Sequence, residues 1–135
     1  LVIDVKTHKI MGSWPNGCGT EGPRGIAVDS KRQFAIVACT DHLQVMDAAH
    51  AGALLGKLDT GAGVDNIGLV DSRIYAGAGK AAKLTIASVD DKGQLTLVAS
   101  AATADGARNA VASENGDAYL VDGKTAHLLV AHLNK

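Results

Sequence analysis

Short apolar runs alternate with polar turns along the whole chain, at the two-residue period that is typical of β-strands. One segment organises this pattern: residues 21–30 open with Gly22-Pro23 and continue as an alternating strand. Two weaker copies occupy residues 63–72 and 106–113, and Gly22, Gly63 and Gly106 follow one another at intervals of 41 and 43 residues. A repeat of this length that begins with a short strand indicates four-stranded propeller blades rather than helical repeats.

The four strands of a blade, named A to D in chain order, can be placed on the sequence. Two complete sets are expected, at residues 25–28, 33–39, 43–47 and 53–58, and at 67–70, 73–77, 83–88 and 95–100. Asp and Gly in the turn at 90–93, and Asn-Gly at 115–116, suit tight turns, because these residues tolerate the backbone angles that such turns require.

Incomplete sets flank the two complete ones. Residues 1–5 and 10–14 are expected to form strands C and D, and strands A to C are expected at 109–112, 117–121 and 127–130. The predicted fold is all-β, an incomplete β-propeller ring whose blades have four antiparallel strands. We expect one domain, divided as 1–22, 23–62, 63–105 and 106–135. Because propellers close with roughly four to eight blades, missing blades or a second copy are expected to complete the ring.

Composition limits the classes of partner. The 13 basic and 14 acidic residues give a net charge of −1, and no Lys/Arg-rich run is present, so we expect no nucleic acid partner. The longest apolar stretch, residues 95–104, is interrupted by Thr and Ser and is shorter than the ~20 residues that span a bilayer. No membrane span is therefore expected.

Three sequence features mark the blades: a Gly-Pro-x-Gly-Ile-Ala opening at residues 22–27, an aromatic residue in each second strand, and two third strands that end in Val-x-Asp. The aromatic residues are Phe34, Tyr75 and Tyr119, and the Val-x-Asp endings lie at 2–4 (Val-Ile-Asp) and 45–47 (Val-Met-Asp). Together they resemble the bacterial YVTN-type β-propeller repeat, although the strand at 83–88 lacks the final Asp and the third opening has Ala in place of Ile. The resemblance implies a periplasmic or extracellular protein that binds a protein, peptide or cell-surface ligand, and it supplies no catalytic motif.

Polar residues mark the start of each innermost strand. Arg24, Asp65 and Arg108 occupy equivalent positions, and Asn66 and Asn109 follow the last two. In a propeller these positions face the mouth of the central channel, where arginine and asparagine suit an anionic or carboxylate-bearing ligand. The alternative is that the two arginines only bridge neighbouring blades, for example through Asp65, since such ion pairs occur without function.

Both cysteines are expected on one face of the propeller, because Cys18 lies in a D-to-A connection and Cys39 ends a strand B. The segment that holds Cys18 is longer than its counterpart, so we favour a disulfide that fixes this insertion in an oxidising compartment. The alternative is a packed Cys39 and a free Cys18. With His42 the cysteines offer three ligands from two loops, which is too weak a set to predict a zinc or copper site.

The sequence favours a non-catalytic binding or scaffold module, without a cofactor, whose ligand lies at the channel mouth or on a loop face. The alternative is a propeller enzyme of the lactonase or quinoprotein type with a metal or cofactor at the mouth. That alternative needs clustered oxygen or imidazole ligands. Asp65, Asn66 and Asn109 instead accompany two arginines.

Overall fold

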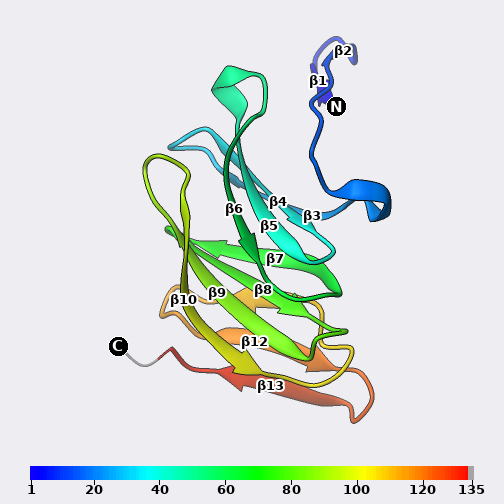
Figure 1. The fold of residues 1–135 in the computed structure, drawn as a ribbon, viewed down its shortest axis with the longest axis vertical. Helices are drawn as coiled ribbons and strands as arrows, with labels where there is room; N and C mark the ends of the chain where they lie inside the picture. Colours follow the sequence, from blue (N-terminus) through cyan, green and yellow to red (C-terminus); the bar gives the residue numbers. More distant parts are fainter. Residues whose placement is uncertain (134–135) are drawn as a thin grey trace.

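The computed structural model describes residues 1–133 and consists almost entirely of antiparallel strands (Figure 1). A two-stranded hairpin contains β1 (Val2–Ile3) and β2 (Ile10–Gly12), and a three-stranded sheet contains β11 (Ala110–Ala112), β12 (Ala118–Asp122) and β13 (His127–Ala131). Between them lie two four-stranded sheets, β3 (Pro23–Asp29), β4 (Phe34–Cys39), β5 (His42–Asp47) and β6 (Ala53–Asp59), then β7 (Val64–Val70), β8 (Arg73–Ala78), β9 (Lys83–Val89) and β10 (Leu95–Ala102). The predicted fold class, four-stranded antiparallel blades in an unclosed ring, is confirmed.

Helical structure is limited to two single turns of 3₁₀ helix, η1 (Gly19–Glu21) and η2 (Ala48–His50). None of the helices in residues 1–133 is long and apolar enough to cross a bilayer. The last two residues of the expected segment 106–135 lie outside the described part of the chain.

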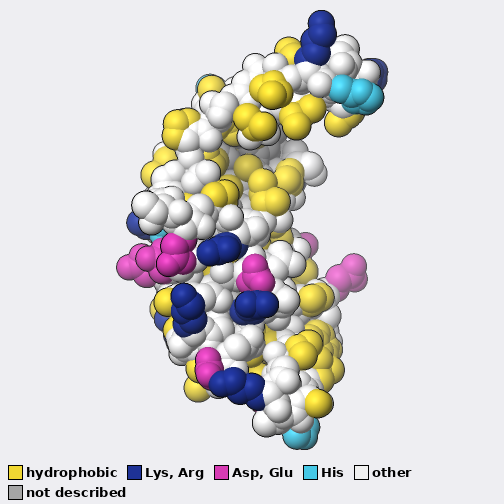
Figure 2. All heavy atoms as spheres, turned by 90° about the vertical axis from the view of Figure 1, so that its right-hand side faces the viewer, with side chains coloured by type: hydrophobic (Ala, Val, Ile, Leu, Met, Phe, Trp, Pro, Cys, Tyr) yellow, Lys and Arg dark blue, Asp and Glu magenta, His cyan; other side chains and the backbone are white. Residues whose placement is uncertain are grey.

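The sheets stack face against face along the long axis of the molecule, with the β1–β2 hairpin at one end and β11–β13 at the other (Figure 1). The side view shows that the stack curves and that hydrophobic side chains line a hollow near the hairpin end (Figure 2). The hairpin is connected to the first sheet partly through Trp14, whose ring covers Gly52 in the β5–β6 turn. A Cβ atom on Gly52 would overlap that ring.

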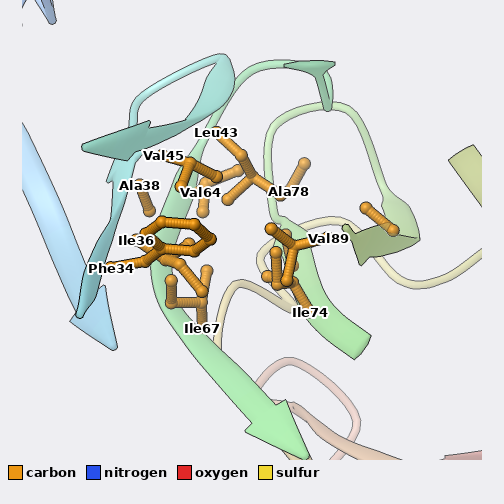
Figure 3. Close-up of a cluster of buried hydrophobic side chains, with 12 residues drawn as sticks. Phe34, Ile36, Ala38, Leu43, Val45, Val64, Ile67, Ile74, Ala78 and Val89 are labelled. Carbon is orange, nitrogen blue, oxygen red and sulfur yellow. The ribbon is translucent and has the colours of Figure 1, made fainter. Parts of the chain in front are cut away.

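The first core lies between the sheets β3–β6 and β7–β10 (Figure 3). Strands β4 and β5 contribute large apolar side chains, and β7 to β9 contribute the facing layer, which includes Val64, Ile67, Ile74 and Val89. Burying these side chains is worth roughly 1.5–3 kcal/mol each. The central members from the first sheet are almost completely buried: Phe34, Ile36, Ala38, Leu43 and Val45.

The second core lies between β7–β10 and β11–β13 and pairs large residues with small ones. Tyr75 and Leu84 are fully buried and pack with Ala107, Ala110 and Ala118. The Tyr75 hydroxyl donates a hydrogen bond of 3.3 Å to the carbonyl oxygen of Gly116, so its polar atom is satisfied in the core.

The turn between β9 and β10 docks on the preceding sheet. A Cβ atom on Gly56 would overlap the carbonyl oxygen of Gly93, so β6 can approach this turn only because Gly56 has no side chain. The Gln94 amide donates a 2.6 Å hydrogen bond to the carbonyl oxygen of Leu55. Backbone contact thus supplements the apolar contact between these two sheets.

Arg32 connects the turns of the same two sheets. Its guanidinium donates to Asp29 at 2.5 Å, to Asp91 at 2.8 Å and to the hydroxyl of Ser72 at 2.8 Å. Asp29 also accepts from the backbone N–H of Lys31 and of Arg32, at 3.1 Å each, which closes its own turn. Burial opposes ionisation of Asp29, but the hydrogen bonds from Arg32 outweigh burial and hold the pKa of this carboxyl below its usual range.

Replacing Leu43 with Ala should reduce the free energy of unfolding by about 2–5 kcal/mol, because it leaves a cavity in the first core. The matched variant Leu97→Ala removes the same atoms from a side chain that is 53% exposed and should change stability by no more than about 0.5 kcal/mol. Urea unfolding followed by circular dichroism measures both. Equal losses from the two variants would contradict the assignment of the core.

Stability should decrease as the pH falls below about 4, in part through Asp29. Its folded-state pKa is lowered, so the unfolded chain takes up the proton first and the stabilisation present at neutral pH is lost in acid. Asp29→Asn should therefore be less stable than the wild type at pH 7, and the gap should narrow at pH 3. Urea unfolding at both pH values tests this. A difference in the free energy of unfolding that stays the same at pH 7 and pH 3 would show that the charge of Asp29 is not its source.

Candidate ligand-binding site

The three innermost strands, β3, β7 and β11, run side by side and align the positions expected at the channel mouth. A parallel bridge joins Asn66 to Asn109. A Cβ atom on Gly25 would lie only 3.0 Å from the Cα of Asn66, so the first two strands approach closely there. The structure therefore places Gly25, Asn66 and Asn109 in one row across three successive sheets.

The residues directly before this row, Arg24, Asp65 and Arg108, line a hollow of about 150 Å³, which we call the mouth hollow. Its charged and hydroxyl side chains come from all three sheets and from the connections next to them: Glu21, Arg24, Thr40, Asp65, Lys80 and Arg108. Figure 2 shows basic and acidic side chains gathered near the middle of the face that it displays. Three cations and two carboxylates give the mouth hollow a net positive charge.

Arg108 bridges two blades. Its Nε atom lies 3.2 Å from Oδ2 of Asp65 on the neighbouring inner strand. Arg108 therefore does form the ion pair between blades that the alternative interpretation of the sequence predicted. Both side chains are about half exposed, at 64% and 45%, and exposed pairs of this kind contribute little, about 0.2–1 kcal/mol. An anionic ligand can therefore compete with Asp65 for Arg108 at low cost.

Arg24 has a different partner from the one suggested by the sequence. Its Nη2 atom lies 3.7 Å from Oε2 of Glu21, in the connection that leads into the same strand, and its Nε donates to the Thr40 hydroxyl at 3.4 Å. The Thr40 hydroxyl in turn donates to Glu21 at 2.9 Å. Arg24 is thus paired within its own blade rather than with Asp65.

Lys80 is exposed and has no ion-pair partner among residues 1–133. It follows strand β8, and Thr40 follows strand β4, so both occupy B-to-C connections. In a propeller the B-to-C connections lie on the same face as the D-to-A connections. This rule could have predicted that Lys80, Thr40 and Glu21 belong to the site. Asn66 and Asn109 are also exposed, and Oδ1 of Asn66 accepts from the N–H of Ile67 at 2.9 Å.

The structure joins Cys18 to Cys39 in a disulfide with a Cα–Cα distance of 5.1 Å. The bond attaches the connection that contains η1 to the end of β4. Because Cys39 directly precedes Thr40, and Cys18 lies three residues before Glu21, the bond holds Glu21 beside Thr40 at the edge of the mouth hollow.

A chain of polar side chains, buried at His42 and Gln44, reaches the disulfide. His42 is 5% exposed, its Nδ1 atom lies 2.5 Å from Oδ1 of Asp41, and its Nε2 atom lies 2.8 Å from Nε2 of Gln44. The Gln44 amide also donates to Sγ of Cys39 at 3.4 Å. The hydrogen bond from His42 is the main cause that lowers the pKa of Asp41.

These contacts occupy both ring nitrogens of His42. The Gln44 amide nitrogen can only donate, so the neutral ring accepts at Nε2 and donates from Nδ1 to Asp41. No group of three or more His, Cys, Asp or Glu side chains within the described 133 residues is arranged to hold a metal ion. The arrangement is that of a satisfied structural histidine.

Comparison with known proteins identifies the fold. No family model matches the chain, and no curated protein matches it significantly. Among solved structures, a chain of the mitotic checkpoint complex is similar with a TM-score of 0.66 and 15% identity, over 84% of this chain and 36% of that one. A protein from Lactobacillus plantarum is similar with a TM-score of 0.59 and 24% identity, over 81% of this chain and 41% of that one. The WD40 domain of SCAP from fission yeast gives a TM-score of 0.45 and 11% identity, over 83% of this chain and 32% of that one.

The first two of these neighbours have folds of the β-propeller type. At these identities the likeness establishes the architecture of the chain, a β-propeller with an unclosed ring. The chain spans 36% and 41% of the lengths of the first two neighbours.

Removing the disulfide should destabilise the protein by about 3 kcal/mol, because the bond closes a loop with a sequence separation of 21 residues. We expect this loss in the double variant Cys18→Ser/Cys39→Ser, measured by urea unfolding. A reducing agent should lower the stability of the wild type to a similar level and leave the double variant unchanged. A wild type that is insensitive to reduction, or that shows two free thiols by alkylation in denaturant, would contradict the bond.

Proposed function

We propose that the chain is part of a non-catalytic binding module that holds an anionic group of a protein, peptide or cell-surface ligand in the mouth hollow. One observation carries this proposal: Arg24, Lys80 and Arg108 converge on one hollow that contains only two carboxylates. Lys80 has no ion-pair partner in the part of the chain that the structure describes. A carboxylate placed there gains charge-assisted hydrogen bonds, which are stronger than neutral ones.

The exposed amides of Asn66 and Asn109 extend this donor surface along the inner strands. Neutral donors beside the cations favour a ligand with carbonyl as well as carboxylate oxygens, such as an acidic peptide. The shallow hollow fits a side chain or chain terminus of a larger partner better than a small molecule, since small-molecule sites enclose roughly 300–1,000 Å³.

We further propose that the module belongs to a bacterial YVTN-type propeller in the periplasm or outside the cell. The Gly-Pro-x-Gly-Ile-Ala opening at residues 22–27 and the two Val-x-Asp strand endings support the family. The bond between Cys18 and Cys39 supports the compartment, because disulfides persist in oxidising environments. The lactonase or quinoprotein alternative has less support, since the two carboxylates of the mouth hollow, Glu21 and Asp65, are each paired with an arginine.

An acidic peptide tests this function. Hexaglutamate should bind the wild type, and the variants Lys80→Ala and Arg108→Ala should each weaken binding about tenfold, because each removes one charge-assisted contact. Chemical-shift changes in NMR spectra, at the side-chain amides of Asn66 and Asn109 above all, measure both the affinity and the location. Raising the salt concentration should weaken binding further.

Lys92→Ala is the matched control, since it removes the same charge from an exposed residue in the β9–β10 turn. It should leave the affinity for hexaglutamate unchanged, and hexalysine should not bind the mouth hollow. An equal loss from Lys92→Ala and Lys80→Ala would show a general charge effect and would refute the site.

A further inference from the structure

A second hollow lies at the other end of strand β7, on the face opposite the mouth hollow. It has a volume of about 310 Å³ and lies between the β7–β8 turn of the second sheet and the β11–β12 turn of the third, so we call it the turn hollow. Strand β7 begins at the mouth hollow and ends at this one, which places the two about 20 Å apart at roughly 3.3 Å per residue. The polar side chains that line the turn hollow come from both turns and from β8 and β9: Asp71, Ser72, Arg73, Tyr75, Ser88 and Glu114.

An arginine crosses the equivalent place between the first and second sheets. In the β3–β4 turn, residues 30–33, Arg32 donates to Ser72 of the β7–β8 turn and to Asp91 of the β9–β10 turn. The β7–β8 turn is shorter, residues 71–72, and no ion pair joins it to the β11–β12 turn within residues 1–133. The place that Arg32 crosses at the first interface is therefore open at the second.

The guanidinium of Arg73 lies at the wall of the turn hollow. A Cβ atom on Gly116 would lie 3.7 Å from Nη1 of Arg73 and 3.8 Å from the hydroxyl oxygen of Tyr75, so the guanidinium reaches the β11–β12 turn. Arg73 is exposed and has no ion-pair partner among the residues that the structure describes. A guanidinium in this position can bind a carboxylate, because it offers two parallel N–H donors.

Two carboxylates line the same hollow, those of Asp71 and Glu114, and neither belongs to an ion pair in the described part of the chain. Asp47 and Asp122 close their own turns by accepting backbone N–H groups. Asp71 accepts no such bond within residues 1–133, so its carboxylate is not used by the fold. Two carboxylates against one guanidinium give the turn hollow a net negative charge, the reverse of the mouth hollow.

We propose that the turn hollow binds a free amino acid with a basic side chain, such as lysine. Its carboxylate pairs with Arg73, and its two ammonium groups pair with Asp71 and Glu114. A ligand with only one kind of charge would leave either Arg73 or the two carboxylates without a partner. The size of the hollow agrees with a small molecule, because such sites enclose roughly 300–1,000 Å³. This site is independent of the mouth hollow and of the ligand proposed for it.

Titration with L-lysine, followed by NMR, tests the site. Lysine should bind the wild type with a dissociation constant on the order of 1 mM. The backbone amides of residues 70–73 and 114–116 should shift, and the side-chain amides of Asn66 and Asn109 should not. Cadaverine, which is lysine without its carboxylate, should bind at least about tenfold more weakly, because Arg73 then has no partner and repels the diamine.

Two variants separate the contacts. Arg73→Gln should weaken lysine binding about tenfold and leave cadaverine binding no weaker, whereas Glu114→Gln should weaken the binding of both ligands. Lys31→Gln and Asp59→Asn are the matched controls, since they remove the same charges from exposed residues outside the turn hollow. Both controls should leave the affinity for lysine unchanged.

The comparison of lysine with cadaverine needs no variant, so it holds even if a substitution disturbs a turn. Three results would each overturn the proposal. They are the absence of a saturable shift at residues 70–73 and 114–116 up to about 20 mM lysine, equal affinities of the wild type for lysine and cadaverine, and equal losses from the control variants and from Arg73→Gln and Glu114→Gln.

Discussion

The structure depends on apolar contact between the faces of successive sheets. A blade of four short strands has apolar side chains on both faces of its central strands, as the nearly continuous burial of β4 and β5 shows, so a single blade in water would expose one side of its core. Stacking one sheet on the next buries these apolar side chains, but only if they pack at the density of a protein interior. Tyr75 and Leu84 opposite three alanines illustrate the fit at the second interface.

This packing leaves the polar residues to the two ends of the strands. At the outer turns, aspartates accept backbone N–H groups and close the turn, as Asp47 does for Ala49 and His50 and Asp122 does for Lys124 and Thr125. These residues are tied to the fold. The inner strand ends make fewer such bonds, and their long side chains are about half exposed. A change of charge at these inner strand ends would therefore break fewer contacts of the fold than a change at the outer turns.

Much of the fold could be predicted from spacing, since the intervals between Gly22, Gly63 and Gly106 place equivalent strands and equivalent side chains. The same reasoning aligned Asn66 with Asn109, which the structure joins by a bridge. It did not find Glu21 or Lys80, because a repeat predicts where a backbone position lies but not where a long side chain in an irregular connection reaches. For that reason Arg24 was matched with Asp65, whereas the inserted segment supplies Glu21 as a nearer partner.

That insertion makes the mouth hollow asymmetric. The disulfide fixes the segment that carries Glu21, and the Thr40 hydroxyl binds both Glu21 and Arg24, so Arg24 is already engaged by two neighbours. Arg108 has a single half-exposed carboxylate partner, and Lys80 has none in the described residues. The positive potential of the hollow is therefore concentrated near Lys80 and Arg108, at the second and third blades. A ligand that follows the charge would meet these two side chains first, because Arg24 is already engaged by Glu21 and Thr40.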